Sequence, residues 1–350
     1  MANIARLSFK IHSLPKVTSA VLANAVPVRA IPRVCRADSQ RWAALALQRH
    51  CFSTSRTTSH SAESNPSHET NKESTIYTVN KDEIAKFAAM SDEWWAPQGP
   101  FKMLHLMNPP RIRYIRNRLE ASGAISGAES NKRFPLQGLR ILDVGCGGGL
   151  LSESLARLGA QVTGLDASVE NVQMAMIHAM KDPLLNGGGP GSIEYRHQTA
   201  EQLAKEGLQF DVVCSLEVIE HVDNPAGFLK VLGELIKPNG DLMLSTISRT
   251  PLSYFLTIFC AEHVMRMVPV GTHHWSKFIT PDELRAGVED LAKCQVQNIQ
   301  GIGFSPLSGQ WELTRSRDGS DSGSGLMSML GPPLSEASNY LLSAKKVGAV

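Results

Sequence analysis

Two carboxylates and an imidazole lie within five residues of one another, at Glu217, Glu220 and His221. This acidic-histidine cluster can bind a hard divalent cation and leave positions open for water or substrate. A cation held there could bind a catechol and lower the pKa of its hydroxyl, which makes a phenolate nucleophile. The same residues also fit His221 as a general base, with Glu217 orienting it or contacting a cofactor, or a histidine that merely caps a loop. The spacing alone leaves these three hypotheses open.

A second set of residues fits a nucleoside-binding turn. The pattern acidic-x-Gly-x-Gly-x-Gly is formed by Asp143, Gly145, Gly147 and Gly149. A dinucleotide turn needs glycine at its sixth position, where this chain has Leu150, and an acid at the strand end suits a cationic ligand better than a pyrophosphate. Asp166 follows about 20 residues after the turn, where a carboxylate can bind the two hydroxyls of a ribose. This combination resembles the class I methyltransferases that use S-adenosylmethionine.

The elements that must position both sets are buried strands that alternate with helical segments. Strands are predicted at residues 140–144, 161–165, 192–197, 211–216, 242–246, 296–303 and 339–344. Because such alternation builds a doubly wound sheet, the predicted fold class is α/β, with a mainly parallel, seven-stranded, Rossmann-like sheet. Ligands of such sheets bind at the carboxyl ends of the strands, which places Leu216 and the acidic-histidine cluster at the predicted site. Residues 199–201 (Thr-Ala-Glu), after the third strand, are expected near an adenine by their position in the fold.

The residues before the first strand predict helices that cover the cofactor. Asn80 can cap a helix that has Glu83 at its third position. Asn108 is expected to cap the next helix, with Pro109 at the first helical position. Arg111, near the start of that helix, is a candidate for pairing with the carboxylate of the cofactor's methionine. Its alternative role is a solvated helix charge.

The charge of the chain is distributed unevenly. Of 35 Lys and Arg and 33 Asp and Glu in 350 residues, nine bases and one acid lie in residues 1–56. This serine-rich segment, almost without acids, predicts a mitochondrial transit peptide, and residues 57–76 predict a disordered linker. The alternative, a basic arm that binds nucleic acid, is disfavoured because the remainder is net acidic. Residues 77–350 then form one methyltransferase domain, since 42% hydrophobic residues fit a folded chain.

Residues 248–278 form an unusual connection after the fifth strand. The stretch 251–261 is strongly apolar, but Glu262, His263 and Arg266 interrupt it, so it is too short to span a membrane. An amphipathic helix here would leave a wide apolar face, which either packs on the core or lies in a membrane interface. Core packing is the default hypothesis, and a cover for a lipid-like substrate is its rival.

The assembled residues resemble the mitochondrial ubiquinone-biosynthesis O-methyltransferases and their bacterial counterparts. The resemblance runs from about Tyr77 to the C-terminus and is carried by residues 94–95, 104–111, 142–149, 217–222 and 266–273. The last of these is specific, because generic methyltransferases lack that insert. The resemblance implies that S-adenosylmethionine is bound by Arg111, Gly145, Asp166 and Leu216. It also implies that Mg²⁺ is bound by Glu217, Glu220 and His221.

The implied reaction is methyl transfer to ring hydroxyls of polyprenylated catechol and hydroquinone intermediates, at two steps of ubiquinone synthesis. The implied location is the matrix side of the inner mitochondrial membrane, with peripheral contact to anionic lipid and membership of a multi-subunit biosynthetic complex. No nucleic-acid partner is expected. The loop at 182–192 exceeds the family pattern, and so does the Gly- and Ser-rich stretch 314–324, which predicts a disordered insertion.

Two other classes of protein stay open. One is a methyltransferase that acts on a different small molecule, including C-methylation in the same pathway. The other is a non-catalytic scaffold of a biosynthetic complex that retains the fold. The presence of Asp143, Gly145 and Asp166 argues against the scaffold, and a cofactor-binding titration would separate the two.

Overall fold

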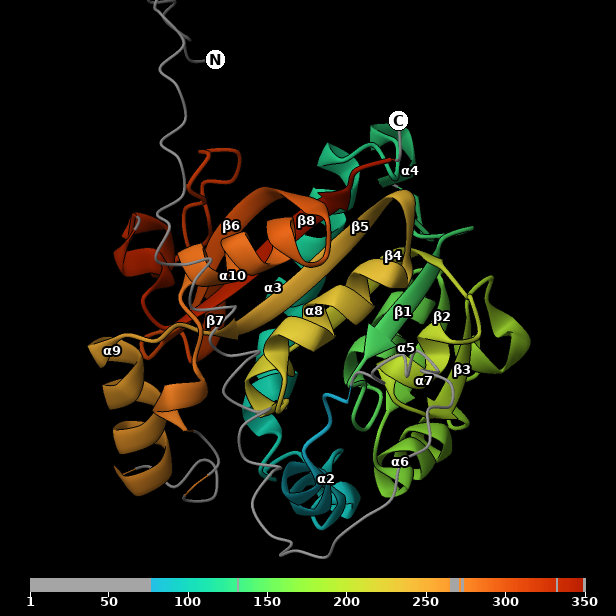
Figure 1. Ribbon diagram of the computed structural model, residues 1–350, viewed down its shortest axis with the longest axis horizontal. Coiled ribbons are helices and arrows are strands. Elements are labelled where there is room, and N and C mark those ends of the chain that lie inside the picture. The colour runs from blue at the N-terminus through green and yellow to red at the C-terminus, as the bar shows by residue number, and fades with distance from the viewer. Residues whose placement is uncertain (1–76, 131, 265–270, 272–273, 332, 349–350) are drawn as a thin grey trace, which may run out of the picture. The chain divides into compact units, whose positions relative to one another are not determined.

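The computed structural model describes residues 77–130, 132–264, 271, 274–331 and 333–348, which are coloured in Figure 1. The predicted transit peptide at 1–56, the predicted linker at 57–76 and most of the 266–273 motif lie outside the described residues. An eight-stranded sheet organises the described part, in the order β3-β2-β1-β4-β5-β8-β6-β7.

The sheet is parallel in its first part and antiparallel in its last. Its strands are β1 (Arg140–Val144), β2 (Gln161–Asp166), β3 (Ser192–His197), β4 (Phe210–Leu216), β5 (Ile236–Ile247), β6 (Cys294–Ser305), β7 (Gln310–Leu313) and β8 (Asn339–Lys346). β1 pairs in parallel with β2 and β4, and β3 and β5 extend this parallel part. β8 pairs antiparallel with β5 and β6, and β7 with β6. The predicted α/β class is confirmed; β7 is one strand more than predicted, since four residues leave too short a pattern to detect.

Helices cover both faces of the sheet (Figure 1). The longer ones are α2 (Lys81–Ala88), α3 (Lys102–Ala121), α5 (Leu150–Arg157), α6 (Val169–Ala179), α8 (Pro225–Glu234) and α10 (Pro281–Asp290). Short helices and turns are α4 (Gly127–Ser130), η1 (Ser91–Glu93), η2 (Leu184–Gly188), α7 (Ala200–Ala204), η3 (Ile219–His221), η5 (Trp275–Lys277), η6 (Leu326–Met329) and η7 (Leu334–Glu336). α8 and α10 pack on one face through residues such as Leu232 and Leu284, and α3 and α5 on the other through Ile115 and Leu155. Two apolar cores therefore enclose the sheet, as in doubly wound folds.

The two helix starts predicted before β1 have different outcomes. Asn80 caps α2, because its Oδ1 accepts hydrogen bonds of 3.0 Å from the backbone N–H groups of Asp82 and Glu83. The prediction for Asn108 is wrong: α3 begins at Lys102, and Asn108 lies inside it. Its side-chain amide instead donates to Oγ of Ser154 at 2.9 Å. Packing of α3 on the sheet therefore overrides the local Asn-Pro signal.

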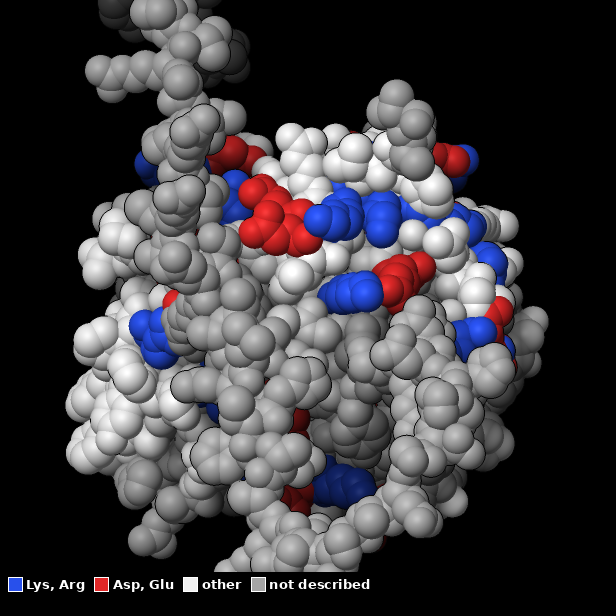
Figure 2. All heavy atoms as spheres, in the orientation of Figure 1, with Lys and Arg blue, Asp and Glu red and all other residues white. Residues whose placement is uncertain are grey.

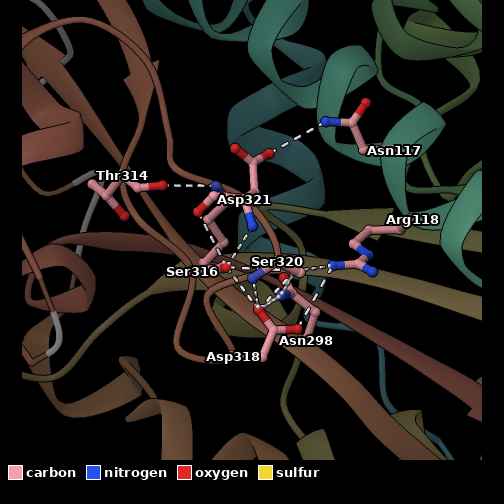
Figure 3. A network of polar contacts seen from close by, with 9 residues as sticks. Asn117, Arg118, Asn298, Thr314, Ser316, Asp318, Ser320 and Asp321 are labelled. Carbon is pink, nitrogen blue, oxygen red and sulfur yellow. Dashed lines mark hydrogen bonds and ion pairs between the residues drawn. The ribbon is translucent and has the colours of Figure 1, made fainter. Parts of the chain in front are cut away.

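The stretch 314–324, predicted to be a disordered insertion, has many polar partners (Figure 3). Oδ1 of Asp318 accepts hydrogen bonds from the hydroxyls of Ser316 and Ser320, each at 2.7 Å, and from the amide of Asn298 on β6 at 3.0 Å. Burial alone would raise the pKa of Asp318, but these hydrogen bonds together hold it below its usual value. Asn117 of α3 also donates to the carboxylate of Asp321 at 3.2 Å. The loop is thus tied to α3 and β6 by hydrogen bonds rather than by an apolar core, which explains why its composition suggested disorder.

The insert after β5 is helical. It consists of α9 (Pro251–Ser253) and η4 (Tyr254–Val264), which continues it with wider turns. Five of its apolar side chains are about half exposed, and they are Leu252, Tyr254, Phe255, Leu256 and Phe259. Figure 2 shows few charged side chains over α9. Core packing, the default hypothesis for this helix, therefore does not describe these five residues. Within the described part of the chain, no helix is long and apolar enough to cross a membrane.

Candidate active site

The turn after β1 requires glycine at three positions, because Gly145, Gly147 and Gly149 all have positive φ angles. Gly145 and Gly147 have φ angles of 76° and 52°, in the left-handed region that side chains disfavour. A Cβ atom on Gly145 would lie 2.5 Å from Cγ2 of Val218, and one on Gly147 would lie 2.3 Å from Cζ2 of Trp94. Trp94 therefore covers the turn, a contact that the sequence did not predict.

The two acids predicted to hold the cofactor lie near the ends of β1 and β2, beside this turn. Asp143 is 2% exposed and accepts a hydrogen bond of 2.6 Å from Oγ of Ser152. Burial raises the pKa of Asp143 to about 6, although the hydrogen bond from Ser152 opposes the shift. Asp166 accepts hydrogen bonds of 2.9 Å from the backbone N–H groups of Gly147 and Ser168, and burial raises its pKa as well. A buried carboxylate is costly to charge, so both favour a ligand that brings a cation or hydroxyl donors.

A cavity of about 670 Å³ joins the glycine turn to the acidic-histidine cluster. It is lined by every residue predicted for the site: Arg111, Asp143, Gly145, Gly147, Asp166, Leu216, Glu217, Glu220 and His221. The cavity lies where the carboxyl ends of β1, β2 and β4 meet, which is where ligands of doubly wound sheets bind. Its volume is within the range of small-molecule sites. The structure thus brings the predicted residues together around one space.

Glu201 also lines this cavity, at the start of α7. Its Oε1 accepts a hydrogen bond of 2.9 Å from the backbone N–H of Thr78 and another from the Thr78 hydroxyl. Oε2 is buried and has no hydrogen-bond partner among the residues that the structure describes. An unpaired buried acceptor can bind an amino group, such as that of adenine, which was expected here. The contact between Thr78 and Glu201 could not be predicted from the sequence, because the two residues lie 123 positions apart.

Arg111 is buried in α3 and faces the acidic-histidine cluster. Its Nη2 lies 3.2 Å from Oε1 of Glu217, and its Nε has no hydrogen-bond partner within the described part of the chain. A buried guanidinium with unused N–H groups can donate hydrogen bonds to a further carboxylate. The alternative of a solvated helix charge does not fit, because Arg111 is only 5% exposed.

Glu217 is held in an unusual backbone conformation at the end of β4. Its φ angle is 57°, which costs a non-glycine residue about 1–2 kcal/mol. The hydroxyl of Ser245 donates to its Oε1 at 2.7 Å, and the amide of Asn339 donates to its Oε2 at 3.3 Å. Backbone strain of this kind persists where neighbouring groups hold the residue in place. In this conformation the carboxylate of Glu217 points to the cavity. The sequence did not predict a role for Asn339.

Glu220 is the most deeply buried acid of the cluster, at 4% exposed. Its Oε2 accepts a hydrogen bond of 2.8 Å from the hydroxyl of Thr246. Burial, and then the charge of Glu217, raise the pKa of Glu220 above its ordinary value. Because two neighbouring carboxylates repel each other when both are ionised, they favour a proton or a cation close by.

His221 is oriented by a residue from another part of the chain. Its Nδ1 lies 3.0 Å from Oε2 of Glu83 on α2, and its ring meets that of Phe87 edge to face at 5.2 Å. The hydrogen bond with His221 lowers the pKa of Glu83, with charges of nearby Lys residues contributing less. Because an ionised carboxylate can only accept, Nδ1 of a neutral His221 carries the proton and Nε2 is free to take another. This is the geometry of a general base with an orienting carboxylate.

The predicted Mg²⁺ ligands point to different partners. Glu217 engages Ser245 and Arg111, Glu220 engages Thr246, and His221 engages Glu83. No three His, Cys, Asp or Glu residues in the described part of the chain are grouped closely enough to hold a metal ion. The residues as they lie therefore do not form a three-ligand site, and the general-base arrangement fits them better.

Comparison with known proteins points to one class of enzyme. A family described as a methyltransferase domain matches residues 111–291. The mitochondrial ubiquinone biosynthesis O-methyltransferase of Arabidopsis thaliana is 46% identical over 75% of this chain and 79% of its own length. The ubiquinone biosynthesis O-methyltransferase of Ruegeria pomeroyi is 48% identical over 68% of this chain and 91% of its own. A magnesium protoporphyrin IX methyltransferase from Synechocystis, solved with its cofactor, is 18% identical over 77% of this chain and 100% of its own, with a TM-score of 0.46.

Proposed function

This chain belongs to the ubiquinone biosynthesis O-methyltransferases, and from that premise we propose its substrate and mechanism. It is an S-adenosylmethionine-dependent O-methyltransferase of ubiquinone biosynthesis. The proposed substrates are polyprenylated catechol and hydroquinone intermediates, methylated on ring hydroxyls at two steps. The observation that carries this proposal is that one cavity joins the glycine turn to a histidine held by a carboxylate, His221 with Glu83.

The cofactor end of the cavity is lined by groups that match the parts of S-adenosylmethionine. Bound there, this cofactor would supply a methyl group on a cationic sulfur. Asp166 is positioned to accept the ribose hydroxyls, and the free Oε2 of Glu201 to accept the adenine amino group. The buried charge of Asp143 favours a cationic ligand, and the unused N–H groups of Arg111 suit a carboxylate. Gly145 and Gly147 let the backbone approach this ligand closely.

The acceptor end of the cavity is arranged to remove a proton. Nε2 of His221 accepts the proton of the ring hydroxyl, and Glu83 stabilises the imidazolium that forms. With S-adenosylmethionine bound, its methyl group would pass to the phenolate oxygen and a neutral thioether would remain, so the residues of this chain must chiefly hold the two reactants close together. Glu217, fixed by Ser245 and Asn339, bounds the space in which the ring would lie.

Assistance by Mg²⁺, with Glu217, Glu220 and His221 as its ligands, stays a separate prediction. It rests on the resemblance and on the two mutually repelling carboxylates, and no step above depends on it. If the ion is bound there, replacing both Glu217 and Glu220 by Ala should abolish metal-stimulated turnover and leave cofactor binding largely intact. Full activity of the wild-type protein in excess chelator would remove the ion from the mechanism.

We also infer a peripheral contact between the insert and an anionic membrane. The half-exposed apolar residues of α9 and η4 support it, because contiguous exposed apolar surface marks sites of association. A location on the matrix side of the inner mitochondrial membrane is proposed because the Arabidopsis relative is mitochondrial. Membership of a multi-subunit biosynthetic complex rests on the family alone.

Product analysis tests the proposed reaction. The protein is incubated with S-adenosylmethionine and a prenylated catechol, and the product is examined by mass spectrometry and NMR. A methyl ether on a ring oxygen supports the proposal, whereas a methyl group on ring carbon would assign C-methylation. A protein that does not bind S-adenosylmethionine in a calorimetric titration would be a scaffold rather than an enzyme.

A further inference from the structure

We propose that the cavity has a second, apolar arm, which holds the first isoprene units of the substrate's tail and opens between two lips. The insert lip consists of Leu252 of α9 and Leu256 of η4, and the C-terminal lip consists of Met327, Leu330 and Leu334. This inference rests on the proposed function, because it assumes that the acceptor carries a prenyl tail. The inference adds the place where the prenyl tail lies and names the residues that select for a substrate with such a tail.

One part of the cavity lining carries no charged side chain. Its residues come from β5, α9, η4, the β6–β7 hairpin, η6 and η7. They are Ile247, Leu252, Leu256, Thr257, Ile302, Gly303, Phe304, Pro306, Trp311, Thr314, Met327, Leu330, Leu334, Ser335 and Ser338. A ligand end that is long and apolar fits this arm, and a charged or sugar-like one does not.

The arm opens to solvent at its far end. Leu252 and Leu256 line it and are each 41% exposed, and Leu330 and Leu334 line it and are 37% and 63% exposed. A side chain that both lines a cavity and is exposed lies at its mouth. Because the cavity of about 670 Å³ must also contain the cofactor and the ring, only the first isoprene units fit inside. The remainder of a longer tail leaves between the lips.

The two lips are held together although they are far apart in the sequence. The backbone N–H of Ser248 donates to the carbonyl of Ser338 at 2.6 Å, and the hydroxyl of Thr250 donates to the carbonyl of Ala337. These bonds join the start of α9 to the segment that follows η7. Figure 1 shows α9 beside the end of the sheet that carries β7.

The C-terminal lip has its own supports. Nε of Arg317 donates to both carboxylate oxygens of the buried Glu336, at 2.9 and 2.8 Å, which fixes η7. The carboxylate of Glu312 accepts from the backbone N–H of Met327 at 3.1 Å, which fixes η6. The network around Asp318 ties the intervening loop to α3 and β6 (Figure 3). The 314–324 stretch therefore serves to position a wall of the apolar arm.

Chain-length dependence tests the arm without any substitution. Full-length protein is assayed with a tailless dihydroxybenzoate and with analogues that carry one, two or three isoprene units, all below the concentration at which they aggregate. We expect kcat/KM to rise with the first units and then to level off, because units beyond the mouth make no further contact. Equal kcat/KM for every analogue would overturn the arm but leave the proposed reaction intact. Absence of methyl transfer to any analogue would instead overturn the proposed function.

A matched pair of surface variants locates the arm. Leu334→Asp places a charge at the mouth, and Leu307→Asp places one on a residue that is 87% exposed but does not line the cavity. We expect Leu334→Asp to lower the ratio of kcat/KM for prenylated over tailless substrate about tenfold, since a charge at the mouth opposes burial of the tail. Leu307→Asp should keep the wild-type ratio. The same ratio in both variants would place the tail elsewhere, and the chain-length series decides the question if Leu334→Asp fails to fold.

Discussion

The carboxylate of Glu83 lies 3.0 Å from Nδ1 of His221, across 138 residues of sequence. The contact joins α2 to the edge of the sheet at the end of β4, and Lys277 lies 3.8 Å from the other oxygen of the same carboxylate. The helix before the sheet therefore orients the imidazole as well as covering the cavity. The candidate base and its carboxylate partner are far apart in the sequence, and only the folding of the chain brings them together.

Removing this partner should slow turnover without weakening cofactor binding. Glu83→Gln keeps the size of the side chain but removes the charge that stabilises a protonated His221, so we expect kcat to fall about tenfold or more. KM for S-adenosylmethionine should not change. Steady-state kinetics measures both constants. Asp82→Asn is the control, because Asp82 is exposed on the same helix and should keep the wild-type kcat; equal kcat in both variants would remove Glu83 from the mechanism.

Affinity for the cofactor should depend on pH through Asp143. Burial raises the pKa of this carboxyl to about 6, so the ligand-free protein takes up a proton as the pH falls through that value. A cationic ligand favours the charged carboxylate, and its affinity should therefore fall up to about tenfold per pH unit below that pKa. Calorimetric titrations on both sides of the pKa measure this slope. A wild-type affinity that stays constant across the range would show that Asp143 does not face the charge of the cofactor.

The same ionisation has the opposite effect on the ligand-free protein. Because the folded-state pKa of Asp143 is raised, the carboxyl stabilises the fold at low pH, and this contribution is lost as the pH rises toward the raised pKa. Asp143→Asn, which cannot ionise, should remove this part of the pH dependence. The variant should also bind the cofactor more weakly than the wild type above that pKa.

The glycine turn should tolerate no side chain at position 147. Gly147→Ala adds about 1 kcal/mol of backbone strain and forces the new Cβ against Trp94, so we expect at least about a tenfold loss of affinity for S-adenosylmethionine. Gly123→Ala is the matched control, since Gly123 has a φ angle of 77° with no neighbour within 4 Å of a Cβ. The Gly123→Ala variant should lose stability through backbone strain alone and keep its affinity for S-adenosylmethionine. Equal affinities in the two variants would show that the turn is not in contact with the cofactor.

The insert should carry the contact with lipid. Polar substitutions at Phe255 and Phe259, which stack at 5.4 Å and are about half exposed, should reduce sedimentation with anionic liposomes. Met180→Ser is the control, because Met180 is 62% exposed but lies at the end of α6. Unchanged sedimentation of the Phe255 and Phe259 variants would show that the insert does not bind the membrane.

Much of the fold was predictable because local patterns carried it. The apolar strand 140–144, its bare glycine turn and the following helix are signals that a parallel sheet leaves in any sequence. Asp143 and Asp166 followed from spacing, since Asp143 is the last but one residue of β1 and Asp166 is the last residue of β2, both beside that turn. All the residues predicted for the site do line one cavity.

What the sequence did not reveal depends on contacts between distant segments. Glu83 was predicted only as a helix-capping residue, and its partner His221 could not be identified from spacing. Asn108 carried a strong local signal that packing of α3 overrode. The composition of 314–324 suggested disorder because the partners of its polar residues, such as Asn298 for Asp318, lie on other elements.

The most direct test of the mechanism is methyl transfer to a prenylated catechol by the wild-type protein and His221→Ala, each with Mg²⁺ and with excess chelator. The account predicts a ring O-methyl ether from the wild type, and a kcat at least about 100-fold lower in His221→Ala in either condition. It predicts substantial wild-type turnover in chelator, because Nε2 of His221 takes the proton. Wild-type turnover by His221→Ala, or no methyl ether from the wild-type protein in either condition, would contradict it.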